Sequence, residues 1–265
     1  MNTPRPILTA VALAVALVAT LAVTSAHAGR SCEQQPPQAR NVERAMNLAL
    51  ATAKQLDQSG AQVVVIARAG QDLGKYGLRY SHLGFAYRDG NAWRVAHKLN
   101  HCGTAQGAIY RQGLGEFFLD DLFDYRAGIV IPTPAVQALL LPALKDNAKL
   151  AQLNTTSYSM LAYPWATKYQ QSNQWALETL AMTQEPGATT RAKAQSWLQL
   201  KGYEPTTLKL SATTRLGARV TAANVAFDDH PSEKRFSDRI ETVTVDSVFA
   251  WLTRSGLGGA EQIVR

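Results

Sequence analysis

Two histidines that a β-hairpin would bring together are the first residues of this sequence that could do chemistry. Tyr80–Asn100 alternates apolar and smaller or polar residues on both sides of Asp89-Gly90-Asn91, a tripeptide that suits a tight turn. Centring the turn on its glycine puts His82 nearly opposite His97 or Lys98. An imidazole held by a second polar group can act as a general base, which makes His82 the candidate base and His97 its candidate orienting partner. Two ordinary strand histidines are the alternative.

A polar cluster, Gln170–Trp175, opens a predicted helix and could supply the rest of a site. Backbone N–H groups at a helix N-terminus stabilise negative charge. Ser172 is therefore the candidate nucleophile, with Asn173 or Gln174 as donors to an oxyanion. The alternative is that Ser172 only caps the helix. Two aromatic residues complete the set of candidate binding residues: Tyr80 and Trp175.

The two cysteines, Cys32 and Cys102, are expected to pair in an oxidising compartment. Such a bridge would pin the N-terminal segment beside the loop after the hairpin, and a loop of that length stabilises the fold by ~4 kcal/mol in the chain-entropy model. The alternative is that Cys102 is a nucleophile beside His101. A bridge would remove the thiolate that such chemistry needs.

The first 28 residues have the pattern of a secretory signal peptide. Arg5 precedes an apolar stretch, Ile7–Val23, and Ala26-His27-Ala28 fits a cleavage site. An uncleaved membrane anchor is the alternative. We expect an exported, periplasmic protein that keeps no transmembrane segment after cleavage.

The charge pattern argues against a nucleic-acid groove. The formal net charge is +7, but the basic residues are scattered without a run of five. Asp228-Asp229-His230 could in principle ligate a metal, yet adjacent residues rarely converge on one ion, so no metal site is predicted. The chain has no P-loop and no dinucleotide-binding glycine motif, and no cofactor is expected.

Helices and strands are predicted in mixed order, which indicates an α+β fold with an antiparallel sheet packed against helices. Residues 29–265 form one domain, or one domain with an appended subdomain from about residue 187. The expected elements of the first part are a helix over 41–58, strands over 62–67, 127–131 and 155–163, and a helix over 135–153. Those of the second part are helices from 172 or 173 to 182, from 189 or 190 to 201, and from 246 or 247 to 253, and a strand over 241–245. Residues 102–115 are expected to be a loop, 204–223 are ambiguous, and the tail after Gly256 is expected to fray.

Three segments carry a resemblance to a known family: Val65–Gly70, Tyr80–Gly84 and Tyr169–Trp175. In them the chain resembles an uncharacterised bacterial secreted family, the domain of unknown function number twenty-one forty-five, over nearly the whole mature chain. That resemblance implies no activity, because none is assigned to the family.

More distantly, the order of these motifs is similar to permuted NlpC-type, papain-like proteins, which include the lecithin:retinol acyltransferase group. There a strand histidine and a polar residue precede a cysteine at a helix N-terminus. The resemblance implies that His82 is the base, His97 its orienter, and Ser172 or Asn173 stands at the nucleophile's position. This chain departs from the pattern because no cysteine follows Cys102.

The sequence therefore supports a hydrolase of amide or ester bonds in the cell envelope, acting on cell-wall peptides or acyl lipids. A catalytically inactive envelope-binding module with the same cleft is the alternative, which the missing cysteine favours. A purely structural envelope protein is a third possibility.

Overall fold

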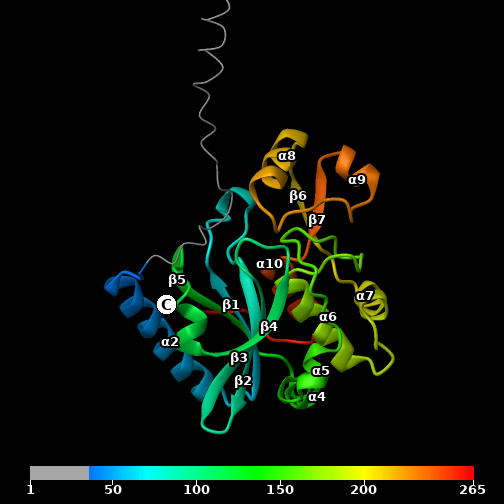
Figure 1. Cartoon of the computed structure of the whole chain (residues 1–265). Helices are drawn as coiled ribbons and strands as arrows, with labels where there is room; N and C mark the ends of the chain where they lie inside the picture. The colour runs from blue at the N-terminus through cyan, green and yellow to red at the C-terminus, as the bar shows by residue number, and fades with distance from the viewer. Residues whose placement is uncertain (1–35) are drawn as a thin grey trace, which may run out of the picture.

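A computed structural model describes residues 36–265, and its centre is a six-stranded antiparallel sheet with the strand order β4-β3-β2-β1-β5-β8 (Figure 1). The strands are β1 (Val63–Ala69), β2 (His82–Asp89), β3 (Ala92–Asn100), β4 (Gly107–Gly113), β5 (Asp124–Val130) and β8 (Gln262–Val264). The signal peptide and Cys32 lie outside the described residues, so both predictions that concern them stay predictions. The expected class, α+β with an antiparallel sheet packed against helices, is confirmed.

Helices cover both faces of this sheet. They are α2 (Ala39–Ser59), α3 (Leu114–Phe118), α4 (Pro134–Lys145), α5 (Asn147–Ala151), α6 (Ser172–Gln184), α7 (Arg191–Leu200) and α10 (Val245–Arg254), with a short 3₁₀ helix η1 (Gly74–Tyr76). Val64 and Ile66 of β1 pack in one core with α2 and α3, whereas Val63 and Val65 pack in another with α4, α6 and α10. We call these sides the α3 face and the α6 face. Because both are covered, β1 is buried along its whole length.

The β2–β3 hairpin forms as predicted, with Gly90 at positive φ in its turn. Asp89 pairs with Ala92, and this register runs back along the hairpin. Gly84 is required by close packing: a Cβ there would lie 2.8 Å from the Ala96 carbonyl oxygen and 2.9 Å from the Cβ of His97. The two strands can therefore come together at His97 only because position 84 has no side chain.

A small second sheet projects beyond the main one at the top of Figure 1. It pairs β6 (Thr206–Lys209) with β7 (Arg239–Thr242) and carries α8 (Ala212–Thr221) and α9 (Ser232–Phe236). Its own core contains Leu208, Phe227 and Ile240. Residues 204–223, ambiguous in sequence, are thus a strand followed by a helix.

Four expectations about secondary structure were wrong. Part of the expected loop 102–115 is β4, and the expected strand 155–163 has only one isolated bridge, at Ser157. The expected helix 135–153 is two helices, because Asp146 is extended and its side chain caps α5. The tail does not fray, since β8 pairs with β5 and Glu261 accepts a hydrogen bond from the Tyr80 hydroxyl at 2.8 Å.

Candidate functional site

His82 and His97 do meet, as the hairpin predicted. Nε2 of His82 lies 2.8 Å from Nδ1 of His97, and both side chains are buried. Both rings lie beside Phe117 of α3, with centroids 6.0 and 5.3 Å from its ring. The pair therefore lies on the α3 face of the sheet.

The hydrogen bonds around this pair fix the direction in which each ring donates. Gln112 uses its amide nitrogen to donate to Glu116, so its oxygen must accept the bond from Nε2 of His97, at 2.7 Å. A neutral His97 then has only Nδ1 left as an acceptor. This nitrogen accepts the hydrogen bond that the Nε2–H of His82 donates. The result is a one-way chain of donors from His82 through His97 and Gln112 to exposed Glu116.

The surroundings keep both rings neutral. Burial, followed by the positive charge of Arg68, lowers the pKa of His82 well below its usual value. Burial and Arg68 also lower the pKa of His97 to about 3. A histidine of such low basicity is a weak general base at neutral pH, because the best catalytic pKa lies near the working pH.

Ser172 lies elsewhere. It is the first residue of α6, and the cap is its neighbour Gln171, whose side chain accepts from the Asn173 N–H. The Ser172 hydroxyl lies 3.2 Å from the hydroxyl of buried Tyr158. Within residues 36–265, no hydrogen bond joins Ser172 to either histidine of the pair. The serine is therefore neither the helix cap nor the partner of the predicted base.

The sheet itself separates the predicted catalytic residues. Leu83, next to His82, points the other way and packs against α6. The α6 N-terminus reaches that side too, where the side-chain oxygen Oδ1 of Asn173 accepts from the Leu83 N–H at 3.0 Å. The structure brings His82 and His97 together and leaves Ser172 on the opposite face, so the three do not form one catalytic group.

The other candidate binding residues hold the fold together. The Gln174 amide faces the carbonyls of Tyr163 and Pro164, and Trp175 is fully buried against Phe85. Tyr80 is buried beside Gly128, and burial raises the pKa of its hydroxyl.

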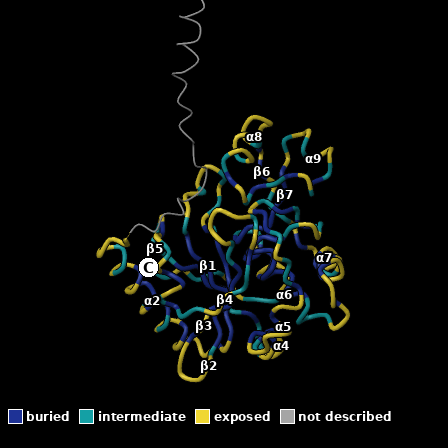
Figure 2. Tube along the Cα trace, viewed as in Figure 1, coloured by how far each residue is buried: buried dark blue, intermediate teal, exposed yellow. Residues whose placement is uncertain are grey.

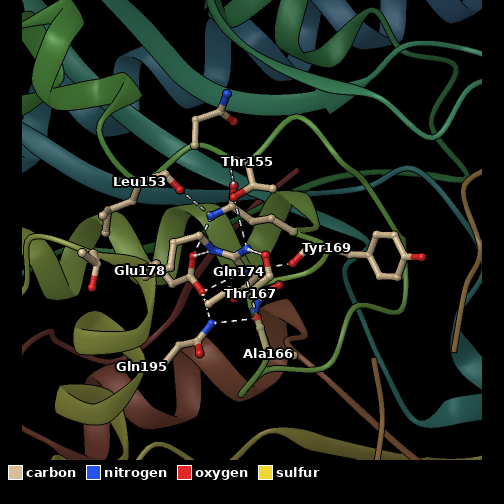
Figure 3. Close-up of polar contacts among 12 residues, drawn as sticks. Leu153, Thr155, Ala166, Thr167, Tyr169, Gln174, Glu178 and Gln195 are labelled. Carbon is tan, nitrogen blue, oxygen red and sulfur yellow. Dashed lines mark hydrogen bonds and ion pairs between the residues drawn. The ribbon is translucent and has the colours of Figure 1, made fainter. Parts of the chain in front are cut away.

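Sequence reasoning missed a buried ionic cluster on the α6 face (Figure 3). Both carboxylate oxygens of Glu178 are bound by Arg191, at 2.7 and 3.2 Å. Gln170 and Gln195 donate to the same carboxylate at 2.6 and 2.7 Å. Arg191 also donates to three backbone carbonyls of the loop before α6: Ala166, Thr167 and Tyr169. Glu178 is the only charged residue of α6, and this was the available signal, because buried acids need partners.

Lys98 extends this cluster into the sheet. Its ammonium donates to Asn154, to the Thr155 carbonyl and, at 2.8 Å, to Gln170. Burial, followed by the charge of Arg191, lowers the pKa of Lys98 to about 7. The cluster ties β3, the loop and two helices into one unit, so its arrangement is that of a structural core.

The remaining candidates from the sequence are the His230 loop, a membrane-spanning segment and Cys102. His230 is buried between its neighbour Asp229, at 2.9 Å, and the Glu241 carbonyl, also at 2.9 Å. Among the described residues no three metal-binding side chains are grouped. Within the same residues no helix is long and apolar enough to span a bilayer. Cys102 lies in the turn after β3, and its predicted partner Cys32 is outside the described chain.

Comparison with protein families gives a match over more than half of the chain. Residues 55–252 match the model of DUF2145, a family described as an uncharacterised protein conserved in bacteria. No curated protein and no solved structure matches the chain. The matched range includes β1, the histidine hairpin, the ionic cluster and most of α10. This chain therefore belongs to the DUF2145 family.

Proposed function

We propose that this protein is an exported, non-catalytic binding protein of the bacterial cell envelope. One observation carries the non-catalytic part: His82 and Ser172 lie on opposite faces of a sheet that is covered on both sides. A nucleophile and its base must come within hydrogen-bond reach of each other, directly or through one water. The signal-like N-terminal sequence supports the envelope location.

An amide or ester hydrolase of papain-like architecture is the competing function. It would need the serine and the histidine to reach one substrate, and it would need a base more basic than either buried ring. The papain-like pattern also requires a cysteine at the helix N-terminus, and this chain has no cysteine after Cys102, which likewise argues against the hydrolase.

The test is to measure binding and turnover on the same mature protein. Binding would be followed by co-sedimentation with purified peptidoglycan and with membrane vesicles from a Gram-negative bacterium. Turnover would be followed with cell-wall peptides and with acyl esters. We expect binding to at least one envelope fraction and no hydrolysis above a heat-inactivated control.

Two variants separate the functions. Ser172→Ala and His82→Gln should leave envelope binding unchanged, provided that their melting temperatures show that they fold. Hydrolysis that both variants abolish would establish the hydrolase and overturn the proposal. Failure to bind any envelope fraction would overturn the binding role.

A further inference from the structure

We infer that Asp229 and His230 form a buried, proton-dependent latch, which holds the second sheet on the loop before α6 and opens as the pH rises. While the latch is closed, His230 carries a proton on each ring nitrogen. The part of the loop that it holds is residues 159–170, which we call the docking loop. This inference does not depend on the proposed envelope role.

Hydrogen bonds on both sides of the His230 ring carry its protonation state. Nε2 lies 2.9 Å from the backbone carbonyl of Glu241, and a carbonyl can only accept, so Nε2 must carry a proton. Nδ1 lies 2.9 Å from a carboxylate oxygen of Asp229. An ionised carboxylate also only accepts, which places a second proton on Nδ1. The ring is then an imidazolium whose charge Asp229 balances.

The surroundings of the pair favour a positive ring. Both side chains are fully buried, so water does not replace either partner. Burial, followed by the negative charges of Glu241, Glu233 and Asp229, raises the pKa of Tyr163. The Tyr163 ring lies 5.1 Å from the His230 ring, centroid to centroid, so the same acids act on both. Lys234 of α9 lies close by as well, but it binds the carboxylate of Glu241.

The latch belongs to a junction between the second sheet and the docking loop. The other carboxylate oxygen of Asp229 accepts the Tyr163 N–H at 2.7 Å. On the β7 side of the junction, the Thr242 hydroxyl donates to the Ala162 carbonyl at 3.3 Å. In Figure 2, α8 and α9 are largely exposed, whereas β7 is buried except at its first residue. The second sheet is therefore held to the rest of the protein from its inner side, where the latch lies.

Loss of one proton from the ring breaks this arrangement. A neutral ring can donate to only one of the two oxygens, so its other nitrogen would face an oxygen at 2.9 Å with lone pairs in contact. If Nδ1 is the nitrogen that loses its proton, Asp229 becomes a buried charge without a counter-charge, which is strongly destabilising. Opening of the junction would relieve both contacts, because water could then reach the two side chains.

The second sheet should move rather than the docking loop. Arg191 holds the loop on its other side through the carbonyls of Ala166, Thr167 and Tyr169. An exposed histidine is mostly neutral above a pH of about 6.5, so in that range the closed form holds one proton more than the open form. The equilibrium constant for closing then falls by up to about tenfold per pH unit.

Nitrogen-15 nuclear magnetic resonance of the imidazoles tests the protonation state in the mature protein. We expect the His230 ring to show a proton on both nitrogens at pH 7, whereas the neutral rings of His82 and His97 show one each. The variant His230→Gln assigns the signals. An Nδ1 of His230 without a proton at pH 7 would overturn the inference, because the pair would then carry no charge on the ring.

Amide hydrogen exchange between pH 7 and 9 tests the opening. Protection factors, which correct for the intrinsic effect of pH on exchange, are compared between the β6–β7 hairpin and the central strands β1–β3. We expect protection of the hairpin to fall by about 10-fold to 100-fold, and that of β1–β3 not to fall. A local measurement is needed because the pKa of Lys98, lowered to about 7, makes the global stability rise over the same range.

Three variants assign the pH dependence. His230→Gln and Asp229→Asn should show at pH 7 the low protection of the hairpin that the wild type reaches at pH 9, without further dependence on pH. Lys168→Gln is the matched control, because it removes the more exposed pair of Lys168 with Asp228 at the same junction and should keep the dependence of the wild type.

The wild-type comparison decides even if a variant fails to fold. Protection of the hairpin that stays constant between pH 7 and 9 would overturn the latch, and so would an equal loss of protection in the hairpin and in β1–β3. A dependence on pH that persists unchanged in His230→Gln would assign it to another group and would also overturn the inference.

Discussion

His97 and Lys98 are neighbours in β3, yet their side chains end in opposite kinds of environment. Both are buried, and burial lowers the pKa of both. His97 lies on the α3 face in a chain of neutral donors and acceptors beside Phe117. Lys98 lies on the α6 face in a cluster with the carboxylate of Glu178 and the guanidinium of Arg191.

The difference shows two ways to bury polar side chains in one sheet. At the histidine pair charge is avoided, because burial and the nearby charge of Arg68 keep the two imidazoles neutral. On the α6 face charge is kept and compensated, with every oxygen of Glu178 bound twice. The second solution depends on all its members, since a buried charge that loses its partner is strongly destabilising.

The buried ionic cluster on the α6 face should lose more stability on substitution than the histidine pair. Glu178→Gln keeps the shape of the side chain but leaves Arg191 without its counter-charge, so we expect a loss of about 3–5 kcal/mol in the free energy of unfolding. Chemical denaturation would measure it. Glu204→Gln is the control, because its pair with Arg254 is exposed and should change the stability by less than about 1 kcal/mol. Equal losses in both variants would contradict the contrast.

The Lys98 side chain should make the stability rise with pH in the alkaline range. Its pKa falls from 10.5 to about 7 on folding, so between these values the unfolded chain holds the extra proton. Each pH unit then adds up to about 1.4 kcal/mol to the stability, or about 2–3 kcal/mol between pH 7 and 9. Denaturation curves of wild type and Lys98→Gln at several pH values would test this, and parallel pH dependences would refute it.

Gly84→Ala should disturb the histidine pair by displacing the backbone of the two strands that carry it. The new Cβ would meet the Ala96 carbonyl and the Cβ of His97, both closer than 3 Å, so β2 and β3 must move apart. We expect a loss of about 2 kcal/mol, within the usual range for overpacking. Gly113→Ala is the matched control, since a Cβ there meets nothing within 4 Å. Nuclear magnetic resonance of the imidazoles should also show the His82–His97 hydrogen bond weakened in Gly84→Ala alone.

The free energy of unfolding should fall gradually with decreasing pH because of the histidine pair. The pKa of His97 falls from 6.5 to about 3 on folding, so below pH 6.5 the unfolded chain takes up a proton that the folded chain refuses. Stability is then lost by about 1.4 kcal/mol per pH unit as the pH falls from 6.5 toward 3. His97→Gln should remove this histidine's share of the dependence and leave the share of His82, whose pKa is lowered as well, whereas His101→Gln, an exposed histidine, should leave the dependence as it is. A slope that is unchanged in His97→Gln would assign it to other groups.

Local patterns predicted most of the elements that are regular over a long stretch. The helix expected over 41–58 is Ala39–Ser59, and the helix expected from 172 is Ser172–Gln184. The failures came where tertiary contacts decide the outcome. β8 is only three residues long and is a strand because it pairs with β5. Residues 155–163 have β-like composition, but their backbone groups bind the ionic cluster and the neighbouring loops instead.

For the candidate site, the turn at Gly90 fixed the register and thereby predicted the contact of His82 with His97. It could not predict which helix each face of β2 would meet, because both faces carry small or apolar residues. The assumption that α6 lies on the histidine face was the step that failed. The pairing of Glu178 with Arg191 was equally hidden, since it depends on how α6 packs against α7.

The strand order also constrains how the protein can fold in time. β1 to β4 are joined in sequence as neighbours, but in the described part of the chain the strand that covers the far edge of β5 is β8, about 130 residues later. Until that last segment has been synthesised, β5 presents an open edge of the kind that recruits other chains. The pairing of β8 with β5 therefore protects against misassembly only late in synthesis. Shortening the protein by its final few residues should raise its tendency to aggregate during refolding more than it lowers the stability of the finished fold.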